Sequence, residues 1–250
     1  MAIFSKYADY YNLFYAEKDY KAEADYIDSL IKQYSEISVN HILNIGCGTG
    51  NHDQFLVDYG YQIDAFDMSE KMIKTAKSKK ISNANFFVAN TNTFFSDKKY
   101  DCIISLFHVL SYHINNDAVN KMFEIVKNNL KPGGIFIFDC WSGVGVLNDP
   151  PVVRVKDFDT VNEKILRIAI PEMHYELNVV DVNYRLKIED RITHVTNEVI
   201  ENHKMRYFFQ TELLLYAKNN ALEIDFFYEW MTRESLNKNS WNMCFSGKLK

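Results

Sequence analysis

Short apolar runs alternate with longer amphipathic segments through the first half of the chain. The apolar runs have the length of buried strands and lie at 41–45, 62–66, 85–88, 102–107 and 135–138. The segments with apolar residues at helical spacing are 20–34, 69–80 and 116–130, and Ser69 is a suitable N-cap for the second. This alternation is typical of βα units, which build a parallel sheet covered by helices.

A different pattern begins after Trp141. Over residues 180–188, apolar and polar side chains alternate strictly, which predicts an antiparallel strand with one solvated face. The stretches 164–170 and 193–207 are also β-like, so we expect an antiparallel layer over residues 143–208. The chain then returns to a helix and two closing strands, at 213–219, 225–228 and 242–245.

Together these patterns predict an α/β fold, with a Rossmann-like, doubly wound, mostly parallel sheet and an antiparallel β insertion. The expected organisation is a helical and aromatic N-terminal segment (1–40), an α/β core that binds a ligand (41–142), the antiparallel insertion (143–208), and a closing helix and strands (209–250).

Composition narrows the class of protein. The 250 residues are 47% hydrophobic and carry a formal charge of -5, which suits a globular protein and argues against binding to nucleic acid. The four cysteines form no C-x-x-C pair, so we expect no metal. No apolar run approaches the roughly 18 residues that span a bilayer, and the N-terminus has no export signal. We therefore expect a cytoplasmic protein that binds neither membranes nor nucleic acids.

Glycine is scarce, yet three of the nine glycines lie within five residues, at Gly46, Gly48 and Gly50. They follow the first predicted strand, where backbone N–H groups can approach a ligand without an intervening Cβ. Asp67 ends the next strand, 21 residues after Gly46, and an acid there can accept both hydroxyls of a ribose. These features indicate a nucleotide or nucleoside site.

The spacing of the glycines discriminates between ligands. A dinucleotide fingerprint would place its third glycine at position 51, where this chain has Asn51. No G-K-[ST] follows the loop, which excludes a phosphate-binding P-loop. The spacing therefore disfavours NAD.

At these motifs the chain resembles the class I S-adenosylmethionine-dependent methyltransferases. Residues 42–50 resemble the first motif of that family, 67–73 its acidic motif, and 130–134 the turn before its fifth strand. The resemblance implies S-adenosyl-L-methionine as the cofactor and S-adenosyl-L-homocysteine as its product. It assigns to the cofactor site Tyr20, Asn44, Gly46, Cys47, Gly48, Asp67, Met68, Asn90, Thr91, Leu106 and Phe107.

By this resemblance, Gly46 and Gly48 would pass under the methionine part and Asp67 would hold the ribose hydroxyls. Met68 would lie against adenine, whereas Leu106 and Phe107, at the end of the fourth strand, would line the sulfonium.

Asn44 and Asn90 depart from the resemblance, which implies an acid at both positions. An Asn carbonyl still accepts a hydrogen bond, but the attraction between charges is lost. A non-catalytic binding or scaffold protein therefore stays open as an alternative. A nicotinamide-dependent oxidoreductase is a third hypothesis, which Asn51 disfavours.

The aromatic segment at residues 10–15, followed by Lys18 and Tyr20, resembles the leading segment of bacterial N-methyltransferases that act on nucleotide-linked amino sugars. That resemblance implies a segment folded over the cofactor, with Tyr15 and Tyr20 in the site. It suggests methyl transfer to the nitrogen or oxygen of a small polar, anionic acceptor. A carbohydrate or surface-polysaccharide precursor is the expected class, with a nucleotide-linked amino sugar or a phosphorus-bearing group as examples.

Methyl transfer requires alignment and, for some acceptors, a base. His108 is the first candidate and His203 the second, with Tyr15 as a further catalytic candidate. His113 and His194 are weaker alternatives. Arg206 suits either an anionic group of the acceptor or an ion pair. A homodimer through an exposed strand edge also stays open.

Overall fold

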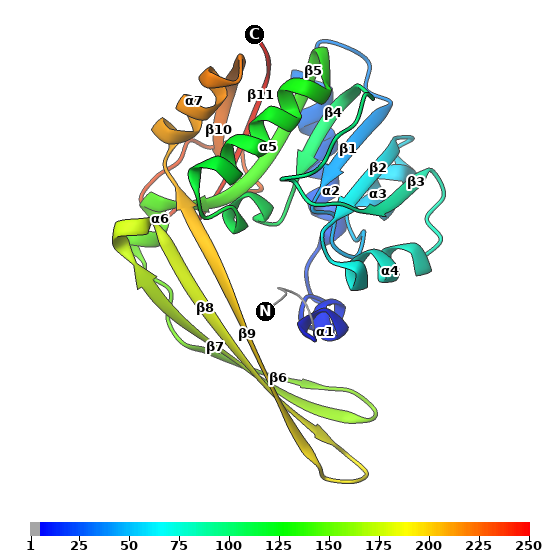
Figure 1. Ribbon diagram of the computed structural model, residues 1–250, viewed down its shortest axis with the longest axis vertical. Helices are drawn as coiled ribbons and strands as arrows, with labels where there is room; N and C mark the ends of the chain where they lie inside the picture. The colour runs from blue at the N-terminus through cyan, green and yellow to red at the C-terminus, as the bar shows by residue number, and fades with distance from the viewer. Residues whose placement is uncertain (1–5) are drawn as a thin grey trace.

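The computed structural model describes residues 6–250, and one mixed sheet runs through this part of the chain (Figure 1). Its parallel half has the strand order β3-β2-β1-β4-β5. These strands are β1 (His41–Ile45), β2 (Gln62–Asp67), β3 (Ala84–Val88), β4 (Tyr100–Ser105) and β5 (Leu130–Ser142). The chain order changes direction at β1, so the carboxyl ends of β1 and β4 flank the crevice where such sheets bind ligands.

Helices cover both faces of the parallel strands (Figure 1). Successive residues of β1 alternate between the two cores, because Ile42 packs on one face while Leu43 and Ile45 pack on the other. The helices are α2 (Tyr20–Tyr34), α3 (Asp53–Asp58), α4 (Glu70–Ser78), α5 (Asn116–Asn129) and α7 (Gln210–Asn219). Ser69 caps α4 as predicted, since its side chain accepts a hydrogen bond from the Met72 N–H.

Antiparallel strands continue the sheet beyond β5 and project from the core as an arm (Figure 1). The arm consists of β6 (Arg154–Asp159), β7 (Glu163–His174), β8 (Val179–Asp190) and β9 (Thr196–Phe208). It joins β5 where Trp141 and Ser142 pair in parallel with Tyr207 and Phe208. On the other side, β5 pairs with β11 (Asn242–Leu249), which pairs with β10 (Leu222–Glu229). The predicted doubly wound sheet with an antiparallel insertion is confirmed.

Helix α1 (Tyr7–Phe14) lies between the core and the arm (Figure 1). Tyr7 and Phe14 are buried against apolar residues of β7 and β8. The Glu201 carboxylate of β9 accepts hydrogen bonds from the backbone N–H groups of Lys6 and Tyr7, each at 2.9 Å. On the core side, Asp9 forms an ion pair with Lys71 of α4 at 2.8 Å. Helix α1 is therefore attached both to the arm, through Glu201, and to the core, through Lys71.

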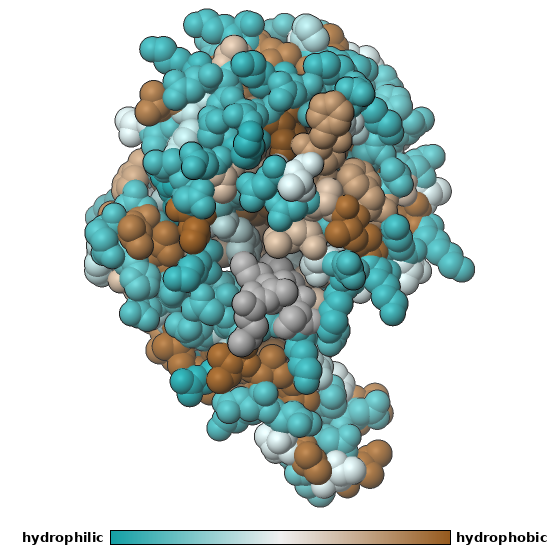
Figure 2. All heavy atoms as spheres, in the orientation of Figure 1, coloured by the Kyte–Doolittle hydropathy of each residue, from teal (hydrophilic) through white to brown (hydrophobic). Residues whose placement is uncertain are grey.

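Several short elements were not predicted. They are α1, α3, the 3-10 turn η1 (Val109–Tyr112), α6 (Gly143–Asn148) and β6. Strand β5 also begins earlier than expected, at Leu130, and passes through Gly133, whose φ of 77° bends the strand at its start. No helix within residues 6–250 is long and apolar enough to cross a membrane. Exposed apolar side chains gather at the far end of the arm, where Val161 and Ile192 lie in the hairpin turns (Figure 2).

Candidate active site

A cavity of about 400 Å³ opens at the carboxyl ends of β1, β2 and β4, beneath α1. Its size is within the range of small-molecule sites, roughly 300 to 1,000 Å³. Every candidate catalytic and cofactor residue chosen from the sequence lines it: Tyr15, Tyr20, Asn44, Gly46, Cys47, Gly48, Asp67, Met68, Asn90, Thr91, Leu106, Phe107, His108 and His203. The structure therefore brings all of them together, while their individual roles stay predictions.

The glycine loop forms one wall of the cavity. The Gly46 and Cys47 N–H groups both donate to the Phe66 carbonyl of β2, at 2.8 and 3.0 Å, which fixes the turn. A Cβ at Gly46, where φ is 74°, would lie 2.5 Å from a methyl carbon of Val109. At Gly48, where φ is 56°, a Cβ would have no protein atom within 4 Å. Gly46 is thus required by packing, whereas the side of Gly48 that lacks a Cβ faces open space.

Asp67 ends β2 beside this loop. One carboxylate oxygen accepts the Gly48 N–H at 3.0 Å, and the other accepts the Ser69 N–H at 2.8 Å. Burial raises the pKa of Asp67, and these two hydrogen bonds oppose the rise. The carboxylate therefore ties the glycine loop to the start of α4 and presents its remaining acceptor positions to the cavity.

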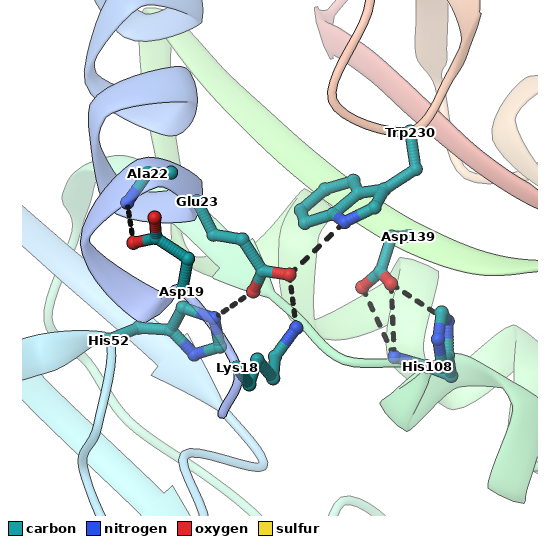
Figure 3. Close-up of polar contacts among 8 residues, drawn as sticks. All are labelled: Lys18, Asp19, Ala22, Glu23, His52, His108, Asp139 and Trp230. Atoms are coloured by element: carbon teal, nitrogen blue, oxygen red, sulfur yellow. Dashed lines mark hydrogen bonds and ion pairs between the residues drawn. The ribbon is translucent and has the colours of Figure 1, made fainter. Parts of the chain in front are cut away.

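His108 is placed by an unusual turn after β4. Phe107 and His108 both have left-handed backbone conformations, with φ values of 66° and 63°, which is strained for residues with side chains. The buried carboxylate of Asp139 stabilises the turn, because the His108 N–H lies 3.2 Å from each of its oxygens (Figure 3). His108 Nδ1 also lies 2.8 Å from Asp139 Oδ2. Asp139 thus fixes the backbone of the turn and places a negative charge beside Nδ1 without hydrogen-bond geometry, and Nε2 is on the opposite edge of the ring.

The other histidines are held more fully by the protein. His203 is buried in β9, with Nδ1 3.1 Å from the Tyr112 hydroxyl and Nε2 3.4 Å from Glu201. His113 uses both ring nitrogens, toward Thr91 at 2.9 Å and the Val109 carbonyl at 3.2 Å, and burial lowers its pKa.

His194 lies outside the cavity. It is exposed in the turn between β8 and β9 and pairs with Glu189 at 3.1 Å. Of the four histidines, His108 has the geometry best suited to a base, since a carboxylate orients it and one ring edge is left for a substrate.

Aromatic side chains form the roof. Tyr15 packs edge-on against Phe107 with 5.0 Å between ring centroids, and its hydroxyl lies 3.3 Å from that of Tyr7. Tyr7 and Tyr11 also line the cavity, which the sequence reasoning missed. The sequence could have indicated them, because positions 7, 11 and 15 are spaced by four residues and therefore lie on one face of a helix. The lining residues, all within the described chain, include no Lys or Arg.

A buried network around Glu23 connects the roof to the glycine loop. Glu23 of α2 lies 2.6 Å from His52 Nε2, forms an ion pair with Lys18, and accepts a hydrogen bond from the Trp230 indole at 3.3 Å (Figure 3). Burial alone would raise the pKa of Glu23, but the hydrogen bond and charge of His52, together with Lys18, lower it to about 2. His52 lines the cavity shortly after the glycine loop and is a further residue that the sequence reasoning missed.

Arg206 does not line the cavity, so of its two predicted roles the structure supports the ion pair and not the binding of an anionic acceptor. Its buried guanidinium donates to Glu212 of α7 at 2.8 Å and to Asn116 of α5 at 2.9 Å. Asn116 is 90 residues away and Glu212 lies in the first turn of the helix that follows β9, so the sequence alone does not show that they meet at Arg206. The Arg206 guanidinium therefore joins β9 of the arm to α5 and α7 of the core.

Replacing Arg206 by alanine is therefore expected to lower the free energy of unfolding by roughly 2 to 4 kcal/mol, because Glu212 and Asn116 lose a buried partner. Urea denaturation checks this. Lys204→Ala is the matched control, since its ion pair with Asp181 is half exposed and is worth less than about 1 kcal/mol. A loss of acceptor binding by Arg206→Ala without a loss of stability would contradict this structural role.

Comparisons with known proteins agree with this geometry. The family model of a methyltransferase domain matches residues 42–134. The chain is 28% identical over 138 residues to the dTDP-3-amino-3,4,6-trideoxy-alpha-D-glucopyranose N,N-dimethyltransferase of Streptomyces venezuelae, which is 54% of this chain and 57% of that protein. Across three curated relatives, the matching segments span 57% to 59% of the relative's length.

Two solved structures resemble the chain over nearly its whole length. One is an S-adenosylmethionine-dependent methyltransferase from Clostridium acetobutylicum, with a TM-score of 0.79, 23% identity and 98% of each chain covered. The other is the sugar N-methyltransferase KedS8 from Streptoalloteichus, with a TM-score of 0.82, 17% identity, and 96% of this chain and 92% of that chain covered. These findings confirm the predicted fold, and the family model confirms a methyltransferase domain over residues 42–134.

Proposed function

We propose that this protein transfers a methyl group from S-adenosylmethionine to the nitrogen of a small polar acceptor, and that the acceptor is an amino-sugar precursor such as a nucleotide-linked amino sugar. The observation that carries this proposal is one cavity with two chemically different parts. The glycine loop, Asp67 and Met68 line one part, and His108 with an aromatic roof lines the other. The relatives named above include two enzymes that methylate nitrogen on sugars.

The residues of the first part fit the cofactor. Asp67 is half-buried and lines the cavity, which suits two ribose hydroxyls. We assign Met68 and Asn90, which also line the cavity, to the adenine, and Gly48 leaves room for a ligand against the backbone. Tyr20 also lines the cavity, and we assign it to the cofactor part.

When bound, S-adenosylmethionine supplies an electrophilic methyl group on a sulfonium. The task of the protein is then to align the acceptor and remove its proton. His108 accepts that proton at Nε2, while Asp139 beside Nδ1 holds the ring in place and stabilises the imidazolium that forms. His203 and Tyr15 complete the wall around the acceptor.

The aromatic roof favours nitrogen over oxygen as the methylated atom. Aromatic faces attract cations, so they stabilise both a sulfonium and an alkylammonium product. Among the described residues that line the cavity, none is a Lys or an Arg that could pair with an anionic group of the acceptor. We therefore place such a group, for example a diphosphate, outside the cavity. A homodimer also stays a prediction, since β6 is an edge strand of the arm.

The direct test is to incubate the protein with S-adenosylmethionine and a dTDP-linked amino sugar, and to follow methylated product and S-adenosylhomocysteine by mass spectrometry. The dTDP sugar with a hydroxyl in place of the amine is the control and is expected to give no product. If calorimetry detects no affinity for S-adenosylhomocysteine, the non-catalytic alternative replaces this proposal.

A further inference from the structure

The face of the arm that packs on α1 carries cations beside the cavity. Strands β6 and β7 pair so that Lys156 lies directly opposite Arg167, and Arg154 lies two residues from Lys156 on the same face. Leu186 of β8, opposite Arg167, belongs to this face too and packs with α1 in a buried apolar cluster. We call Arg154, Lys156 and Arg167 the inner basic group.

Arg167 is the member of this group that lies beside the aromatic roof. Its Nη1 donates to the Tyr7 hydroxyl at 3.1 Å, and its guanidinium carbon lies 5.8 and 5.9 Å from the ring centroids of Tyr15 and Tyr184. These three tyrosines line the cavity, whereas Arg167 does not. The guanidinium therefore lies next to the roof and just outside the cavity.

No carboxylate neutralises Arg167 within residues 6–250. Its hydrogen bond goes to the neutral Tyr7 hydroxyl and it forms no ion pair, although its side chain is half-buried. Two acids on the same face are engaged elsewhere, because Glu163 accepts from the Tyr10 hydroxyl and Glu201 accepts from backbone N–H groups at the start of α1. A partly buried charge costs free energy unless an opposite charge reaches it.

The outer face of the arm, on the other side of the same strands, has the opposite arrangement of charges. There Lys164 lies opposite both Asp159 and Glu189. Opposite charges across a strand pair stabilise a sheet, whereas like charges directly opposite one another destabilise it. The pairing of Lys156 with Arg167 on the inner face therefore costs stability unless an anion binds between them.

We propose that the inner basic group binds a phosphate or diphosphate group of the acceptor while the acceptor amine lies in the cavity. The planar guanidinium of Arg167 suits two phosphate oxygens, and Lys156 and Arg154 add positive charge along β6. This inference rests on the proposed function. It also supplies the cations that the cavity lining lacks, because the arm, and not the α/β core, holds the charged end of the acceptor.

The test compares two acceptors at saturating S-adenosylmethionine: a dTDP-linked amino sugar, and the methyl glycoside of the same amino sugar, which keeps the amine and lacks the diphosphate. In Arg167→Gln, the KM for the dTDP-linked sugar is expected to rise about 10- to 100-fold, as loss of a hydrogen bond to a charged group implies. In the double variant Arg154→Gln/Lys156→Gln, whose wild-type side chains are exposed, a rise of about three- to tenfold is expected. The KM for the glycoside is expected to change much less.

Arg185→Gln/Lys187→Gln is the matched control. Both side chains are exposed on the outer face of β8, and this variant removes as much positive charge as the double variant of β6. Its KM for the dTDP-linked sugar is expected to equal that of the wild-type protein. An equal rise in this control would mean that net charge alone is responsible and would overturn the inner basic group.

A binding measurement separates this inference from the proposed function. In calorimetry, dTDP alone is expected to bind the wild-type protein, and to bind more weakly in both inner variants and at higher salt. If dTDP binds in this way but no amino sugar is methylated, the inner basic group stands as a phosphate site while the proposed function fails.

The kinetic comparison gives the converse result. If the dTDP-linked sugar is methylated and the inner variants keep the wild-type KM, or raise the KM of both acceptors by the same factor, the inner basic group is overturned while the function stands. Because Arg154 and Lys156 are exposed, their double variant gives this answer even if Arg167→Gln folds poorly.

Discussion

Replacing His108 by asparagine is expected to lower kcat by about 10²- to 10⁴-fold, the usual contribution of a general base. Asparagine tolerates the left-handed backbone at this position, where φ is 63°, and cannot take up the acceptor proton. The affinity for S-adenosylhomocysteine, measured by calorimetry, is expected to stay close to that of the wild-type protein. The loss therefore appears in the chemical step and not in cofactor binding.

Two further variants test whether the loss of kcat comes from His108 itself. Asp139→Asn is expected to lower kcat with little change in the acceptor KM, because Asp139 acts through His108 and does not contact the acceptor. His194→Asn is the control, since His194 lies in an exposed turn of the arm. An unchanged kcat in His108→Asn would show that the acceptor enters without a proton to lose and would remove the role proposed for His108.

The strands and the glycine loop were predictable because their signals are local. A buried parallel strand is a continuous apolar run, and a glycine with positive φ next to a strand end marks a turn, so residues 41–50 reveal their structure without their neighbours. Asp67 is predictable for the same reason, because it is the acidic residue at the end of the next apolar strand. All the cofactor candidates come from such local positions, and all of them line the cavity.

The missed residues depend on partners that are distant in sequence. Helix α1 is stabilised by β7, β8 and Glu201, so its aromatic residues do not show by themselves which surface they cover. Asp139 lies inside an apolar strand, and only the fold shows that it reaches the turn at His108. For Arg206 the sequence leaves two roles open, because Asn116, 90 residues away, meets Arg206 and Glu212 only in the folded chain.

Asp67→Ala is expected to weaken binding of S-adenosylhomocysteine by about 10²-fold or more. Two hydrogen bonds from ribose hydroxyls to a carboxylate are each worth about 1.5 to 3 kcal/mol, and 1.4 kcal/mol corresponds to tenfold in affinity. The variant also removes the acceptor for the Gly48 and Ser69 N–H groups, so part of the loss comes from a looser loop. Calorimetry measures the total.

A modified ligand separates the two contributions. An analogue of S-adenosylhomocysteine without the two ribose hydroxyls cannot bind Asp67, so Asp67→Ala is expected to cost much less affinity for that analogue. Asp64→Ala is the matched control, because Asp64 lies on the same strand but binds Lys98 and Tyr100 instead of lining the cavity. Equal losses for both ligands would mean that Asp67 supports the loop only, and unchanged affinity for S-adenosylhomocysteine would remove the ribose assignment.

The pH dependence of binding follows from the same carboxylate. Burial raises the pKa of Asp67 in the ligand-free protein, and the ionised form is the one that accepts from both hydroxyls. Affinity is therefore expected to be constant at high pH and to fall as the pH drops through this raised pKa. The free energy of unfolding of the ligand-free protein changes in the opposite direction. Because the pKa of Asp67 is higher in the folded state than in the unfolded state, protonation of Asp67 stabilises the fold as the pH falls. Asp67→Asn is neutral at every pH, so its remaining affinity is expected to lose the contribution of Asp67 to the pH dependence, which calorimetry across a pH series can detect.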